Sequence, residues 1–150
     1  MFEKTGKNGE HLFDTSALAK WYLREAQSDE VEAYIRANGP VAISDLTVVE
    51  MRSLLARHRR EKSIDIGLEA QIYATFQEDI RQGFLACHPF PSGLALATTN
   101  LLTLLQDIPL RTLDALHLSI AAEIQADTIA TADHVMVQGA RALDIKVAEF

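Results

Sequence analysis

Four acidic side chains stand in apolar stretches of the sequence, where a buried carboxylate is costly. They are Asp14 after HLF, Glu50 in LTVVEMRSLL, Asp114 in TLDALHLSIA and Asp133 in IATADHVM. Burying a carboxylate without a partner costs several kcal/mol. The sequence has no conveniently spaced lysine or arginine beside each of the four, so a divalent cation is the partner that would offset this cost.

The ligand type indicates which ion and which reaction to expect. Clustered carboxylates suit Mg²⁺ or Mn²⁺, and the chain lacks the Cys/His pattern that would indicate zinc. Two such ions about 3.5 to 4 Å apart can activate a water and stabilise the leaving oxygen of a phosphodiester. The four acids therefore predict a metal-dependent nuclease.

Helix capping is the structural alternative for these acids. Asp14 could cap a helix that starts at Ser16, and Asp133 could cap the helix that it opens. Glu50 and Asp114 are predicted to lie inside helices, where capping cannot explain them. A slightly exposed helical edge is the alternative for those two.

Short apolar strands alternate with helical patterns along the chain. We predict strands at 11–13, 41–44, 84–88, 128–131 and 145–150, and helices at 16–26, 28–38, 45–62, 63–82, 91–107, 111–124 and 133–142. This alternation predicts an α/β fold with a parallel sheet covered on both faces. Functional groups in such sheets collect beyond the carboxyl ends of the strands, where the strand order reverses. Asp14 and Asp133 follow predicted strands and would meet there.

Composition is consistent with one globular domain. The 150 residues are 48% hydrophobic and 23% charged, and we expect a tail at 1–10 followed by a domain at 11–150. The sequence has no apolar stretch of roughly 20 residues and a polar N-terminal segment, from which we expect a cytoplasmic protein without a membrane role. The net charge of −7 argues against a general basic surface for nucleic acid but does not exclude a nuclease.

Several strings, taken in order, resemble a known family. HLFDTSALAKWYL, ISDLTVVEMRSLLARHRR, LRTLDALHLSIAAEIQADTIATADHVM and ALDIKV look like the PIN-domain family, specifically its VapC-type toxin branch. The resemblance covers nearly the whole chain after residue 10. It implies a five-stranded parallel sheet in the order 3-2-1-4-5 and an endoribonuclease that depends on Mg²⁺ or Mn²⁺.

The resemblance also implies a set of site residues. The four acids of the family, which serve as catalytic and metal-binding residues, fall on Asp14, Glu50, Asp114 and Asp133. Its small hydroxyl residues match Ser16 and Thr131, which could bond a metal-bound water or orient a carboxylate.

Three further features could contact RNA. Arg111 lies one turn before Asp114, where it could reach a phosphate or neutralise the acids when no metal is bound. His117 shares a helical face with Asp114 and could touch substrate or a ligating side chain, although a packed helix histidine is the alternative. The basic segment 57–62 could steer RNA, or it could be a solvated helix end whose cations complement the dipole.

The toxin resemblance implies a cognate antitoxin and a homodimer, both using apolar surface on the helices after Ser28 and around Ser63. Other functions remain open: a PIN nuclease that processes RNA without being a toxin, and a non-catalytic PIN-fold binding module, against which the intact acids argue. An aspartyl phosphatase would need a second Asp where Ser16 stands. A receiver domain would need an acceptor Asp at 88–89, which is His-Pro.

Overall fold

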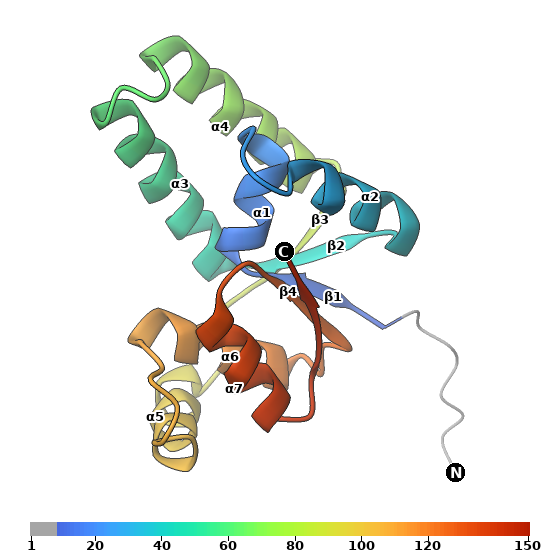
Figure 1. Ribbon diagram of the computed structural model, residues 1–150, viewed down its shortest axis with the longest axis vertical. Helices are drawn as coiled ribbons and strands as arrows, with labels where there is room; N and C mark the ends of the chain where they lie inside the picture. Colours follow the sequence, from blue (N-terminus) through green and yellow to red (C-terminus); the bar gives the residue numbers. More distant parts are fainter. Residues whose placement is uncertain (1–8) are drawn as a thin grey trace.

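Five short strands form one parallel sheet in the computed structural model, which describes residues 9–150 (Figure 1). The strand order is β3-β2-β1-β4-β5, which confirms the predicted order and fold class. Residues 1–8 of the predicted tail lie outside the described part of the chain. The strands are β1 (His11–Phe13), β2 (Val41–Ser44), β3 (Leu85–His88), β4 (Thr128–Thr131) and β5 (Lys146–Glu149).

Helices cover both faces of this sheet, as Figure 1 shows. They are α1 (Thr15–Tyr22), α2 (Ser28–Asn38), α3 (Asp45–Arg60), α4 (Ile66–Arg81), α5 (Leu94–Leu104), α6 (Thr112–Glu123) and α7 (His134–Ala142). One hydrophobic core lies between the sheet and α1 to α4, and a second lies between the sheet and α5 to α7. Beyond the sheet, α3 and α4 continue side by side as an antiparallel pair (Figure 1).

Neighbouring residues of each inner strand pack into opposite cores. Phe13 and Ile43 belong to the core under α1 to α4, whereas Leu12, Ala42 and Ile129 belong to the core under α5 to α7. Successive side chains of a strand point to opposite faces, so a strand covered on both sides must be apolar throughout. This requirement explains the uninterrupted apolar runs in the sequence.

Several helix boundaries differ from the predicted ones. The helix predicted from residue 63 begins at Ile66, because the Asp65 carboxylate accepts a hydrogen bond from the Leu68 backbone N–H at 2.7 Å and fixes the start. The first helix ends at Tyr22 instead of continuing to residue 26, since Leu23 is extended. The fifth begins only after Gly93, whose φ of 76° lies in the left-handed region.

The reversal of strand order places the central strand β1 between β2 and β4. Where β1 ends, the Asp14 backbone N–H donates to the carbonyl of Ala130 in β4 at 3.1 Å. Helices α1, α3 and α7 each start directly after the carboxyl end of a strand, at the same edge of the sheet. Within residues 9–150, no helix is both long and apolar enough to cross a membrane.

Candidate active site

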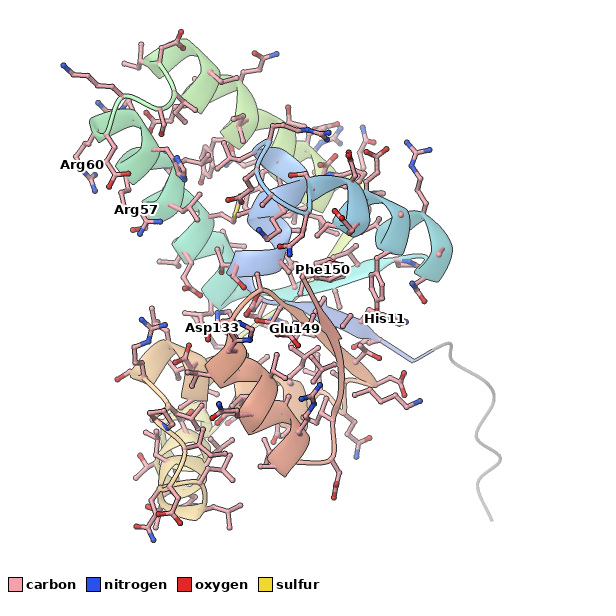
Figure 2. All side chains as sticks on the ribbon, in the orientation of Figure 1. His11, Arg57, Arg60, Asp133, Glu149 and Phe150 are labelled. Atoms are coloured by element: carbon pink, nitrogen blue, oxygen red, sulfur yellow. The ribbon has the colours of Figure 1, made fainter. Side chains whose placement is uncertain are left out.

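The four predicted acids lie together around one cavity of about 620 Å³ at the carboxyl edge of the sheet. They come from four segments: the end of β1, the second turn of α3, the first turn of α6 and the start of α7. Figure 2 labels Asp133, next to the start of α7. The remaining lining residues are Thr15, Ser16, Ser53, Leu54, Arg57, Arg111, Thr112, Leu113 and His117.

Asp14 is the most deeply buried of the four acids, with 5% of its surface exposed. One carboxylate oxygen accepts from the Ser16 hydroxyl at 2.6 Å and from the Ala17 backbone N–H at 3.1 Å, and the other accepts from the Thr131 hydroxyl at 2.5 Å. Burial raises the pKa of Asp14, and these bonds together with the nearby His117 oppose the rise only in part. All the groups that donate to this carboxylate are neutral.

Ser16 and Thr131 therefore hold Asp14 from two segments that are distant in sequence. Ser16 also accepts from the Ala132 backbone N–H at 2.9 Å, and the Thr131 hydroxyl accepts from the Asp133 backbone N–H at 3.0 Å. These bonds tie the start of α1 to the β4–α7 connection. The expected role of the two hydroxyl residues, orienting a carboxylate, agrees with this geometry.

Asp114 and Asp133 both take part in helix N-termini. Asp133 accepts from the Val135 backbone N–H at 2.8 Å and so caps α7. Asp114 accepts from the Arg111 backbone N–H at 2.9 Å. Our inference that capping cannot explain Asp114 is therefore wrong, because α6 begins at Thr112 and places Asp114 in its first turn, where a carboxylate reaches back to the cap residue.

Arg111 bridges the same two acids through its guanidinium. Its Nε lies 3.4 Å from Asp114 and its Nη2 lies 3.2 Å from Asp133. The side chain is 77% exposed, whereas that of Asp114 is 9% exposed. The exposed guanidinium has room to move into solvent, whereas backbone hydrogen bonds hold the two carboxylates in place.

Glu50 is held by two side chains. The His117 Nε2 contacts one of its carboxylate oxygens, and the Thr15 hydroxyl donates to the same oxygen at 3.1 Å. His117 is only 6% exposed, so the geometry favours a residue that positions Glu50 over one that touches substrate. Sequence reasoning missed Thr15, whose only signal was its place between Asp14 and Ser16 just after a strand.

The backbone also contributes positive potential to the cavity. Asp14, Asp114 and Asp133 accept backbone N–H groups at the starts of α1, α6 and α7, so three helix N-termini converge on one site. A helix N-terminus carries about half a positive charge, which favours anions nearby. The fold thus stabilises a concentration of negative charge that isolated carboxylates would resist.

Hard oxygen donors of this kind fit Mg²⁺ or Mn²⁺. The buried Asp14 carboxylate, which has only neutral donors around it, is the observation that favours a cation here. As the side chains stand, no group of three acidic, histidine or cysteine residues within 9–150 is placed to hold a metal ion. Arg111 lies against both Asp114 and Asp133, so its guanidinium would compete with an ion for these two carboxylates.

Comparison with known proteins identifies a matching family and several solved structures with a similar fold. A family model for the PIN domain matches residues 12–141. Among curated proteins, no sequence matches the chain significantly.

Solved structures with a similar fold include three bacterial proteins. FitAcB from Neisseria gonorrhoeae superposes with a TM-score of 0.67 at 18% identity, covering 91% of this chain and 94% of that one. VapBC2 from Rickettsia felis, bound to a promoter DNA fragment, gives 0.68 at 14% identity, covering 93% and 98%. The Mycobacterium tuberculosis toxin VapC20, which cleaves the sarcin–ricin loop, gives 0.66 at 16% identity, covering 86% and 94%. At these identities the likeness shows a common fold.

Proposed function

The chain belongs to the PIN domain family, and from this premise we propose that it is a divalent-metal-dependent endoribonuclease acting as the toxin of a toxin–antitoxin pair. The observation that carries the proposal is the meeting of four carboxylates from four segments in one cavity, including a buried Asp14 whose hydrogen-bond donors are all neutral. Such an arrangement opposes folding unless it serves a ligand.

We assign the metal site to Asp14, Glu50, Asp114 and Asp133, with Mg²⁺ or Mn²⁺ as the ion. When bound, the metal would supply an activated water and neutralise charge on the phosphate. Ser16 and Thr131 hold Asp14 in a fixed orientation, and His117 does the same for Glu50. Arg111 leaves the two acids that it bridges and binds a substrate phosphate instead.

The toxin role rests on the related folds. VapC20 is a toxin that cleaves the sarcin–ricin loop, and a toxin–antitoxin complex from Klebsiella pneumoniae has a similar fold. We therefore propose a cognate antitoxin, a cytoplasmic site of action and a homodimer for this chain. Of the two helices expected to carry the apolar contact surface, α4 exposes Ile66 at 74% and Leu68 at 42%, whereas Val31 and Ile35 of α2 are buried. Leu96 at 68% and Leu104 at 73% add exposed apolar surface on α5.

The test is a cleavage assay on purified protein freed of any antitoxin, with total cellular RNA as substrate. We expect cleavage with Mg²⁺ or Mn²⁺ and none with a chelator. Asp14→Asn should abolish cleavage while leaving the circular dichroism spectrum unchanged. Asp29→Asn is the control, since this acid lies on α2 away from the cavity with a 75% exposed side chain. Cleavage that a chelator does not diminish would refute the proposed mechanism.

A further inference from the structure

The four arginines of α3 separate onto two faces of the helix. Arg52 and Arg59 both pair with Glu69 of α4, a residue only 4% exposed, and so hold α3 against α4. Arg57 and Arg60 are exposed and form no ion pair with any residue in 9–150. In Figure 2 these two side chains project from α3 on the side away from α4.

Helical geometry aligns the unpaired arginines with the active site. At 3.6 residues per turn, Arg57 lies within about 20° of Glu50 around the helix axis, and Arg60 lies within about 80°. By the same geometry Arg59 is about 180° from Glu50, on the face that meets Glu69. Ser53 and Arg57 line the catalytic cavity, and Arg60 lies three residues beyond Arg57, at the end of α3.

The spacing along the axis sets what these side chains can reach. With a rise of 1.5 Å per residue, Arg57 is about 10 Å and Arg60 about 15 Å from Glu50 along α3. They suit the phosphates of successive nucleotides on one side of the cleaved bond.

Charge supports a nucleic-acid backbone as the ligand. The chain carries a net charge of −7, so two unpaired guanidiniums in a row beside an acidic cavity form a local reversal of sign. The cations of a helix C-terminus complement the dipole on any face. The helix dipole does not explain why Arg57 and Arg60 lie toward the Glu50 side of α3, whereas the other two arginines are held by Glu69.

We propose that Arg57 and Arg60 form a phosphate track that leads RNA along α3 into the catalytic cavity, with Arg57 binding nearer the cleaved bond and Arg60 farther from it. This inference rests on the proposed ribonuclease activity and adds residues that position the substrate. The track recognises the sugar–phosphate backbone and leaves base selection to other contacts.

The test measures cleavage kinetics and RNA binding for Arg57→Gln and Arg60→Gln. We expect each substitution to raise KM roughly fivefold with kcat little changed, because an exposed charge-assisted contact is lost away from the reacting atoms. The slope of log KM against log salt concentration should fall by about 0.7 for each arginine removed. Arg57→Lys and Arg60→Lys should recover most of the salt dependence.

Arg141→Gln is the matched control. Arg141 is also exposed and lies in the last turn of α7, at the opposite end of that helix from Asp133, and its loss changes the net charge equally. Its KM and salt slope should equal those of the wild type. If Arg57→Gln and Arg60→Gln behave like Arg141→Gln, the track is refuted even though cleavage is intact.

Oligonucleotides shortened stepwise toward the cleaved bond provide an ordering test. The effect of Arg60→Gln on KM should disappear at a longer RNA length than that of Arg57→Gln, and the reverse order would overturn the assignment. If the wild type cleaves no RNA, the proposed function fails separately. RNA binding, measured by fluorescence anisotropy with a labelled single-stranded RNA, then tests the track. If the dependence of RNA affinity on salt is weaker in both arginine variants but not in Arg141→Gln, the track is supported. Equal salt dependence in all variants, or no RNA binding by the wild type, refutes it.

Discussion

In the active site, the burial of an acidic side chain lowers the stability of the protein but serves the proposed function. Asp14 is buried, and its hydrogen-bond donors are a backbone amide and two hydroxyls. Charging this carboxylate without a metal is unfavourable, which is why its pKa is raised. A carboxylate kept in such a place is available to a cation, and the cost appears as lower stability of the metal-free protein.

This cost predicts a pH-dependent effect of Asp14→Asn on folding. A raised pKa in the folded state favours the fold where Asp14 is protonated, and that contribution is lost as the pH rises through the folded pKa. In chelator at neutral pH, Asp14→Asn should therefore raise the melting temperature by a few degrees. Below the unfolded pKa, about 3.9, the difference should vanish. Thermal unfolding across this pH range measures it, and a variant less stable at neutral pH would contradict the prediction.

The position of Arg111 predicts that its substitution will raise the affinity for metal and lower the affinity for RNA. Because its guanidinium bridges Asp114 and Asp133, Arg111→Gln removes a competitor of the ion and should lower the Mg²⁺ concentration needed for half-maximal thermal stabilisation. Loss of its phosphate contact should raise KM for RNA about tenfold.

Arg36→Gln is the control for Arg111. Its side chain is 75% exposed and paired with Glu32 on α2, which matches the exposure and pairing of Arg111 away from the cavity. We expect no change in the Mg²⁺ titration or in KM for this variant. An unchanged Mg²⁺ midpoint in Arg111→Gln would show that the guanidinium does not compete with the ion.

The distance between α6 and α7 determines how far apart two of the acids lie, since each of these helices carries one acid at its start. Gly139 of α7 faces Leu118 of α6, and a Cβ at this glycine would lie 2.5 Å from a Leu118 methyl carbon. Leu118 is fully buried, so it has little room to move. The glycine thus sets the separation of the two helices.

Gly139→Val should therefore destabilise the protein by about 2 kcal/mol through overpacking, and should reduce cleavage by shifting Asp133 relative to Asp114. Gly67→Val provides the comparison, because this exposed helical glycine has only the Asp65 carboxylate nearby at 3.4 Å. Denaturant unfolding of both variants measures the difference. Equal stability of the two would show that α6 and α7 can separate without cost.

For the molecule as a whole, the proposed toxin role predicts an effect on cell growth. If the chain is a toxin, its expression alone should arrest growth, and Asp114→Asn should restore growth at the same protein level. Growth curves with immunoblots measure both. Normal growth at confirmed high expression would favour a PIN nuclease that processes RNA without being a toxin.

The parallel sheet and the candidate acids could be predicted from the amino-acid sequence alone. Uninterrupted apolar strands between amphipathic helices require a parallel sheet covered on both faces, and an acid that directly follows such a strand lies at its carboxyl end. This pattern predicts that Asp14 and Asp133 lie at the carboxyl ends of strands. The strand order and the places of Glu50 and Asp114 came from family resemblance, since the sequence pattern does not show which strands are neighbours.

The contacts of each acid could be found only in the folded structure. It showed Arg111 between Asp114 and Asp133, His117 and Thr15 on Glu50, and backbone amides from three helix starts around the cavity. It also separated the four arginines of α3 into a pair held by Glu69 and a pair without an ion pair among residues 9–150, of which Arg57 lines the cavity. These contacts join residues far apart in sequence, and packing of the helices on the sheet determines which of them meet.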